Sequence, residues 1–164
     1  PWLATYPHSL RIDEGGWSEA AIKGSSAWWT GISSSTSMVV CAIGSGSTYA
    51  GLVLSKPKHV QVVGVPVYRD PDRYQSLIDK LVRARVPASD IHLWTAFAGR
   101  AFGKLNHQQV EFKRDFEHQT GIELDPVYTA KVLFAVKEKL LAEPQMQLQK
   151  LAVLHTGGLQ GNRT

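Results

Sequence analysis

An apolar run that stops abruptly at small polar residues lies in the first third of the chain: Ser37-Met38-Val39-Val40-Cys41-Ala42-Ile43-Gly44-Ser45-Gly46-Ser47-Thr48-Tyr49-Ala50-Gly51-Leu52-Val53-Leu54. The continuous apolar part is typical of a buried strand, and the residues after Ser47 have the spacing of a helix. We therefore expect a strand, a tight loop over residues 44–47 and a helix that begins near Ser47.

The expected loop has the composition of an anion-binding turn. Gly44 and Gly46 allow the backbone to approach a ligand closely. A helix that begins at Ser47 directs its free N–H groups and the positive end of its dipole into the loop. Phosphate is the expected occupant, because each charge-assisted hydrogen bond contributes about 1.5–3 kcal/mol. A plain tight turn without a ligand is the alternative.

The rest of the chain alternates between strand and helix patterns. Further strands are expected at residues 59–68, 91–94 and 151–155, with short ones at 10–12 and 122–124, and helices at 18–32, 70–85, 106–120 and 125–143. This order predicts a single α/β domain over residues 1–164, with a mainly parallel sheet and helices on both faces. Ligands bind beyond the carboxyl ends of such strands, so residues 44–48, 125–129 and 155–158 are expected to converge there.

Composition narrows the classes of function. The 164 residues are 43% hydrophobic, which is enough for one core, and the net charge of +4 comes from dispersed basic residues. Dispersed charge argues against a nucleic-acid partner, and no apolar run reaches the roughly 18 residues of a membrane span. No metal ligand is assigned. Cys41 is the single cysteine, which favours a reducing, cytoplasmic location. Since the chain begins at Pro1 without Met, we expect a fragment.

Four motifs occur in a fixed order along the chain: Glu14-Gly15-Gly16, Gly44-Ser45-Gly46-Ser47-Thr48-Tyr49-Ala50-Gly51-Leu52, Leu124-Asp125-Pro126-Val127-Tyr128-Thr129-Ala130-Lys131 and His155-Thr156-Gly157-Gly158. Together they resemble the pyridoxal-phosphate enzymes of the 1-aminocyclopropane-1-carboxylate deaminase and D-cysteine desulfhydrase family. The resemblance covers almost the whole chain and corresponds to the C-terminal half of such an enzyme. It implies the tryptophan-synthase-β-like fold (fold type II), a small amino-acid substrate and an assembly for which a homodimer is ordinary.

The same resemblance implies the site residues. Pyridoxal 5'-phosphate is expected to be bound by Ser45, Gly46, Ser47, Thr48, Thr129, His155 and Thr156. Within this set, residues 45–48 match the phosphate-binding turn and Thr129 matches the position beside the pyridine nitrogen. Tyr128 matches the catalytic tyrosine that faces the substrate, for proton transfer or attack. A core position is the alternative for Tyr128, and a structural hydrogen bond is the alternative for His155.

Two positions imply which reaction is preferred. Thr129 resembles the desulfhydrases, whereas the ring-opening deaminases resemble one another in having Glu there. A carboxylate would keep the ring nitrogen protonated, whereas a hydroxyl can only hydrogen-bond it. Phe102 stands where the deaminases have a tyrosine. The resemblance therefore favours β-elimination from a D-cysteine-like substrate over cyclopropane opening.

The resemblance also bears on the lysine that holds the cofactor. In the family this lysine lies upstream of all the motifs present in this chain, and Lys131 matches a different family lysine, which does not form the aldimine. We therefore expect the 164-residue chain to be inactive alone, and we assign the activity to its parent protein.

Two alternative functions remain open from the sequence. Gly44-x-Gly46 after a strand also resembles the start of a Rossmann dinucleotide-binding fingerprint, with Asp70 placed to accept a hydrogen bond from a ribose hydroxyl. The other alternative is a non-catalytic relative with a scaffolding or regulatory role.

Overall fold

The computed structural model describes residues 5–6, 8–9, 12, 14–101 and 103–162. Its strands are β1 (Met38–Ile43), β2 (Gln61–Pro66), β3 (His92–Leu93) and β4 (Leu151–Val153), and its α-helices are α2 (Glu19–Ser25), α3 (Ser47–Ser55), α4 (Pro71–Arg83), α5 (His107–Thr120) and α6 (Thr129–Ala142). Short 3-10 segments are η1 (Glu14–Gly16), η2 (Ser26–Gly31), η3 (Ala88–Asp90), η4 (Thr95–Phe97), η5 (Pro144–Leu148) and η6 (Leu159–Asn162).

The four strands form one parallel sheet in the order β3-β2-β1-β4. Met38 of β1 lies opposite Gln61 of β2 on one side and opposite Leu151 of β4 on the other. Val63 of β2 lies opposite His92 of β3. The chain therefore adds β2 and β3 on one side of β1 and β4 on the other side.

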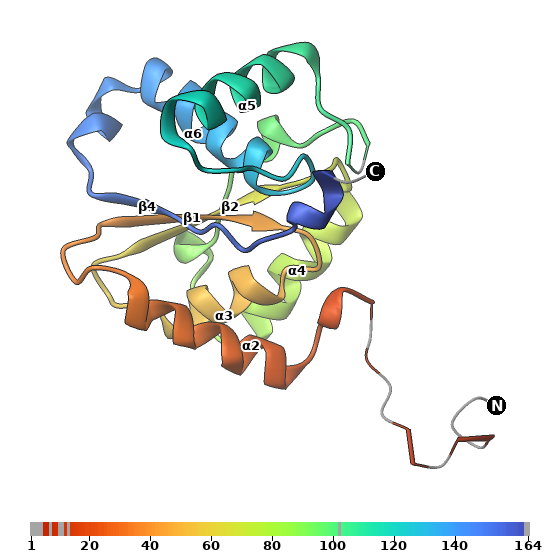
Figure 1. Cartoon of the computed structure of the whole chain (residues 1–164). Helices are drawn as coiled ribbons and strands as arrows, with labels where there is room; N and C mark the ends of the chain where they lie inside the picture. Colours follow the sequence, from red (N-terminus) through yellow and green to blue (C-terminus); the bar gives the residue numbers. More distant parts are fainter. Residues whose placement is uncertain (1–4, 7, 10–11, 13, 102, 163–164) are drawn as a thin grey trace.

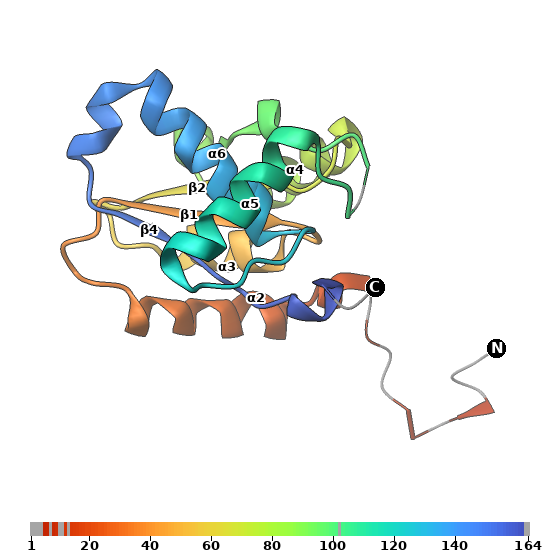
Figure 2. The same ribbon diagram turned by 45° about the horizontal axis from the view of Figure 1, so that its top comes forward.

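Helices cover both faces of this sheet (Figures 1 and 2). Val39 and Cys41 of β1 pack in one core cluster with residues of α3 and α4, and α2 packs outside α3. Val40 points to the opposite face, where it packs with Val132 and Val136 of α6, and α5 lies against α6. A strand that is buried on both faces explains the continuous apolar run of β1. The predicted α/β architecture, a parallel sheet with helices on both faces, is confirmed.

Capping residues determine where several helices begin. The Asp70 carboxylate accepts a hydrogen bond from the Arg73 N–H at 3.0 Å, ahead of Pro71 in the first turn of α4. Asn106 and Gln109 form a capping box at the start of α5. Such side chains satisfy N–H groups that have no acceptor within the helix.

Three predicted elements differ in the structure. The helix expected over residues 18–32 ends as α2 at Ser25 and continues as η2, because the weak helix formers at 24–26 favour a tighter turn. Residues 122–124 form no strand, since the Leu124 N–H is bound by the Glu117 side chain at 2.7 Å. The last long helix begins at Thr129, whereas Asp125 and Pro126 were expected to be its N-cap and its first residue. Residues 10 and 11 of the expected edge strand lie outside the described residues.

Candidate functional site

A small hollow of about 130 Å³ opens at the carboxyl edge of the sheet, beyond the end of β1. It is lined by Gly15, Ala42, Gly44, Ser45, Gly46, Ser47, Thr48, Tyr128 and Thr156. The loops that follow β1 and β4 both contribute, and these are the strands at which the chain order reverses across the sheet. Ligands of parallel α/β sheets bind at such reversal points.

The hollow gathers most of the predicted site residues. Residues 45–48, Tyr128 and Thr156 all line it, although they come from three separate parts of the chain. Thr129 and His155 are not among the lining residues. Gly15 was quoted as part of a sequence motif, but it had no assigned role. In the structure its carbonyl accepts a hydrogen bond from the Ser45 hydroxyl at 2.8 Å.

At the turn between β1 and α3 the N-cap residue has no side chain, and the Ser47 N–H makes only a long contact of 3.5 Å with the Ser45 Oγ atom. Gly46 is the N-cap residue, with a left-handed φ of 94° that favours glycine. A Cβ atom at Gly46 would lie 3.0 Å from the Leu77 Cδ1 atom. Since the N-cap residue offers no side-chain acceptor and the Ser45 contact is long, the first-turn N–H groups of α3 keep their capacity to bind an anion, and the positive end of the helix dipole acts in the same direction.

Hydroxyl groups supply the other polar atoms of this turn. The Ser45 Oγ atom lies 3.1 Å from the Ser47 Oγ atom, so the two hydroxyls share a hydrogen bond. Thr48 lies half-buried in the first turn of α3. Among the described residues that line the hollow, none is acidic or basic. An anion would therefore be bound by neutral donors and the helix dipole.

Tyr128 places a phenol against this turn. A Cβ atom at Gly44 would lie 3.0 Å from the Tyr128 Cε1 atom and 3.6 Å from its phenol oxygen, so the ring packs directly on the glycine backbone. Burial raises the pKa of Tyr128, and the Asp125 carboxylate raises it further, while Arg73 acts in the opposite direction. The phenol is therefore protonated at neutral pH and is able to donate a proton or a hydrogen bond.

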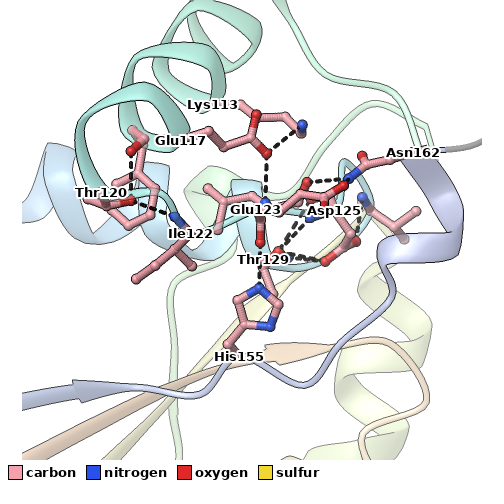
Figure 3. A network of polar contacts seen from close by, with 12 residues as sticks. Lys113, Glu117, Thr120, Ile122, Glu123, Asp125, Thr129, His155 and Asn162 are labelled. Atoms are coloured by element: carbon pink, nitrogen blue, oxygen red, sulfur yellow. Dashed lines mark hydrogen bonds and ion pairs between the residues drawn. The ribbon is translucent and has the colours of Figure 1, made fainter.

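A buried carboxylate positions the backbone around Tyr128. Asp125 is fully buried, and its Oδ1 atom accepts hydrogen bonds from the N–H groups of Val127 at 2.8 Å and Tyr128 at 2.7 Å. Its Oδ2 atom accepts from the Thr129 N–H at 2.9 Å and the Thr129 hydroxyl at 2.6 Å (Figure 3). These bonds order residues 126–128 as a turn, which is why α6 begins three residues later than the predicted start at Pro126.

Thr129 belongs to this internal network. Its side chain is 2% exposed, and its hydroxyl also accepts a hydrogen bond from the Asp125 N–H at 2.9 Å. The hydroxyl is thus directed at Asp125 rather than into the hollow. The expected position of Thr129 beside a pyridine nitrogen stays a prediction.

The segment that leads into Asp125 is held by side chains from α5 and from the end of the chain (Figure 3). The Glu117 carboxylate accepts from the Leu124 N–H at 2.7 Å and pairs with Lys113 at 2.7 Å. The Asn162 amide donates to the Glu123 carboxylate at 2.8 Å and to the Leu124 carbonyl at 3.0 Å. These contacts fix residues 123–125 and hence the start of α6.

His155 links the loop after β4 to the same segment. Its Nδ1 atom accepts from the Gly157 N–H at 3.3 Å, so Nε2 carries the proton and donates to the Glu123 carbonyl at 2.8 Å. This is the structural hydrogen bond that the sequence left open for His155. Its expected contact with a cofactor stays a prediction, whereas the next residue, Thr156, lines the hollow.

Lys131 is fully buried and directed away from the hollow. Its amine donates to the Val67 carbonyl at 2.6 Å and to the Ala101 carbonyl at 3.4 Å. Desolvation lowers the pKa of Lys131, and the Asp125 charge opposes that effect. This burial was not predicted from the sequence, although Lys131 lies within an apolar stretch of α6 that could have indicated it.

Asp70 does not line the β1 hollow: its carboxylate caps α4, and it lines a neighbouring hollow that shares Ser45. The dinucleotide alternative therefore has no described acidic group at this hollow to accept a ribose hydroxyl. Phe102, which bears on the expected reaction, lies outside the described residues.

Two other kinds of site were considered over the same described ranges. In residues 5–6, 8–9, 12, 14–101 and 103–162, no group of three or more His, Cys, Asp or Glu side chains is arranged to bind a metal ion. None of the helices in this part of the chain has both the length and the hydrophobicity required to cross a bilayer.

Comparisons with known proteins agree with the resemblance. No family model matches the chain. The bifunctional D-cysteine desulfhydrase/1-aminocyclopropane-1-carboxylate deaminase, mitochondrial, of Arabidopsis thaliana is 31% identical over 131 residues, which is 75% of this chain and 32% of that protein. The D-cysteine desulfhydrase of Yersinia pestis is 26% identical over 132 residues, or 74% of this chain and 40% of the relative.

A solved structure described as a 1-aminocyclopropane-1-carboxylate deaminase homologue superposes with a TM-score of 0.68 at 26% identity, over 87% of this chain and 46% of that one. The chain thus spans less than half the length of each of these proteins. The sequence and structural matches together identify the chain as a part-length relative of the 1-aminocyclopropane-1-carboxylate deaminase and D-cysteine desulfhydrase family.

Proposed function

We propose that this chain is the phosphate-binding and phenol-bearing part of a pyridoxal-phosphate-dependent enzyme that acts on a small amino acid, by β-elimination from a D-cysteine-like substrate. One observation carries the proposal. The uncapped start of α3 and the phenol of Tyr128, which are about 80 residues apart in sequence, line a single hollow at the carboxyl edge of the sheet.

The residues of the hollow fit the phosphate group of the cofactor. The first-turn N–H groups of α3 and the hydroxyls of Ser45, Ser47 and Thr48 would hold it, and the absence of an acidic group among the described lining residues avoids repulsion. Pyridoxal phosphate supplies an electron sink when it is bound. Tyr128 holds a proton on its phenol oxygen at the mouth of the same hollow and is the expected proton donor.

The proposed preference for elimination rests on Thr129, at the position where the ring-opening deaminases resemble one another in having Glu. A hydroxyl beside the ring nitrogen cannot keep it protonated as a carboxylate does. A weaker electron sink is sufficient when the departing group is a good one such as a thiol.

The proposal includes the inactivity of the chain by itself. No lysine lines the described hollow, and the amine of Lys131 is bound to two carbonyls away from it. The lysine that forms the covalent link to the cofactor is therefore proposed to come from outside these 164 residues. Catalysis would belong to the longer protein.

The longer protein tests the proposal directly. Its visible absorption with pyridoxal phosphate is recorded before and after borohydride, and release of hydrogen sulfide from D-cysteine is compared with ammonia release from 1-aminocyclopropane-1-carboxylate. We expect an absorption band that borohydride removes and more rapid release of sulfide than of ammonia. The absence of both the band and the sulfide would overturn the proposal.

A further inference from the structure

A second hollow, of about 470 Å³, adjoins the first. The two share Ser45, and the second extends from there along α4 to Trp17, Arg73 and Lys80. The Lys80 amine lies 4.2 Å from the centre of the Trp17 ring, so its charge is engaged by an aromatic face. Arg73 is the other cation of this hollow.

The Arg73 side chain is held in place by a tyrosine. One of its guanidinium nitrogens donates to the Tyr68 phenol at 2.6 Å, and the guanidinium carbon lies 5.8 Å from the centre of the same ring. Tyr68 follows β2, and the phenol of Tyr74 also donates to its carbonyl. Arg73 is half-buried as a result and does not extend freely into solvent.

No ion pair joins Arg73 to a carboxylate among the described residues, although Asp70 and Asp72 line the same hollow. The Asp70 oxygen Oδ1 is used by the backbone N–H of Arg73. A guanidinium has five N–H donors, and one bond from this side chain is formed here. A cation in the first turn of a helix also lies at the unfavourable end of the dipole, so the charge does not stabilise α4.

The charge of Arg73 acts on the phenol of the first hollow. Burial raises the pKa of Tyr128 most strongly, and Arg73 partly offsets this effect. Arg73 does not line the hollow that contains the proposed phosphate position. Its guanidinium thus lies close enough to influence Tyr128, and the hollow that it lines shares Ser45 with the first hollow.

We propose that Arg73 is a specificity-determining residue that binds a carboxylate on the side chain of the substrate, at the end that extends past Tyr128 into the second hollow. The inference rests on the proposed function and names its substrate class: alanines whose departing group at the β-carbon carries an acid. A planar guanidinium fixed by Tyr68 matches a carboxylate with two parallel hydrogen bonds.

A matched pair of compounds tests this selectivity. S-carboxymethyl-D-cysteine carries the acid, and S-carbamoylmethyl-D-cysteine is its neutral analogue of the same size. In the longer protein loaded with pyridoxal phosphate, we expect kcat/KM to favour the acid by about tenfold or more, the effect of one charge-assisted hydrogen bond. R73Q should abolish the preference. R83Q, at the other end of α4, should retain it.

Calorimetric binding of the same two compounds gives a readout that does not depend on turnover. The inference is supported if S-carboxymethyl-D-cysteine binds tightly and its neutral analogue does not, and if this binding is lost in R73Q and partly retained in R73K. Should neither compound be converted, only the proposed function fails. Equal binding of both compounds by the unmodified protein overturns the inference. An R73Q variant that loses pyridoxal phosphate affinity but keeps its selectivity also overturns it, because Arg73 would then bind the cofactor. Y68F, which removes the phenol that holds Arg73, should show a smaller loss of selectivity.

Discussion

Two polar segments meet at the carboxyl edge of the sheet, residues 44–48 and residues 125–129, and they use their polar groups in different ways. In residues 125–129, the carboxylate of Asp125 and the hydroxyl of Thr129 are buried and bonded within their own segment. In residues 44–48, the helix start is uncapped, and hydroxyls line a hollow. Polar side chains therefore fix the backbone in residues 125–129, whereas in residues 44–48 they are available to a ligand.

The two segments should therefore respond differently to substitution. Loss of the polar side chain of Asp125 or Thr129 should chiefly lower the free energy of unfolding, whereas a change in the anion-binding residues 45–48 should chiefly lower the affinity for pyridoxal phosphate. Tyr128 connects the two, because its backbone N–H is held by Asp125 and its ring lies on Gly44.

D125A should have the largest effect. It leaves three backbone N–H groups and the Thr129 hydroxyl without their buried acceptor, so the free energy of unfolding should fall by about 3–4 kcal/mol. Urea unfolding measures the change. D79A, at an exposed position on α4, is the control and should cost less than about 0.5 kcal/mol. Equal losses in the two variants would show that Asp125 does not support the segment.

T48D should lower the affinity for pyridoxal phosphate without lowering the stability of the fold. The new carboxylate lies in the first turn of α3, where it improves helix stability by about 0.3–1 kcal/mol but repels a phosphate group. We expect the dissociation constant for pyridoxal phosphate to rise about 100-fold, or roughly 2.7 kcal/mol, as measured by equilibrium dialysis. S34D makes a similar change before β1, at the opposite edge of the sheet, and should leave affinity unchanged. Unchanged affinity in T48D would contradict a phosphate position at this helix.

G44A tests the contact between the two segments. An added Cβ atom would lie 3.0 Å from the Tyr128 ring, so the ring must move by a few tenths of an ångström. We expect kcat of the longer protein to fall about tenfold, because small displacements of catalytic groups are costly, while cofactor affinity changes little. G24A is the control, since a Cβ atom there meets open space. A normal kcat in G44A would argue that the position of Tyr128 is not critical.

T129V should have the smallest effect and decides which role this residue has. Loss of the hydroxyl bond to Asp125 should lower the free energy of unfolding by about 1 kcal/mol and leave pyridoxal phosphate affinity unchanged. Thermal or urea unfolding and cofactor titration measure the two quantities. If affinity fell while stability held, Thr129 would belong with the ligand-binding residues, as the sequence led us to expect.

Strands and helix starts could be predicted from the sequence where neighbouring residues alone determine them. The apolar runs of β1 and β2 and the caps Asp70 and Asn106 predict strands and helix starts close to those observed. The predicted start of α6, at Pro126, was wrong by three residues. Asp125 there binds three successive N–H groups through a turn, and helix-capping statistics alone do not predict that arrangement.

The site could be predicted only where backbone and composition define it. The glycines and hydroxyls of residues 44–48 indicate an anion-binding turn without knowledge of distant partners. The direction of His155 depends on the Glu123 carbonyl, which lies 32 positions away in sequence and is brought near by tertiary packing. The Thr129 hydroxyl is bound by Asp125, four residues earlier, in a turn that the pattern of residues does not predict. Arg73 was interpreted as one of many dispersed surface cations, because its bond to Tyr68 has no sequence signature.

The most direct test of the central claim is an amide NMR titration of this chain with pyridoxal phosphate and, separately, with pyridoxal, which lacks the phosphate group. We predict that pyridoxal phosphate causes its largest amide shifts at Gly46, Ser47 and Thr48, and that pyridoxal does not. Shifts concentrated away from the start of α3, or equal shifts with both compounds, would contradict a phosphate bound at this turn.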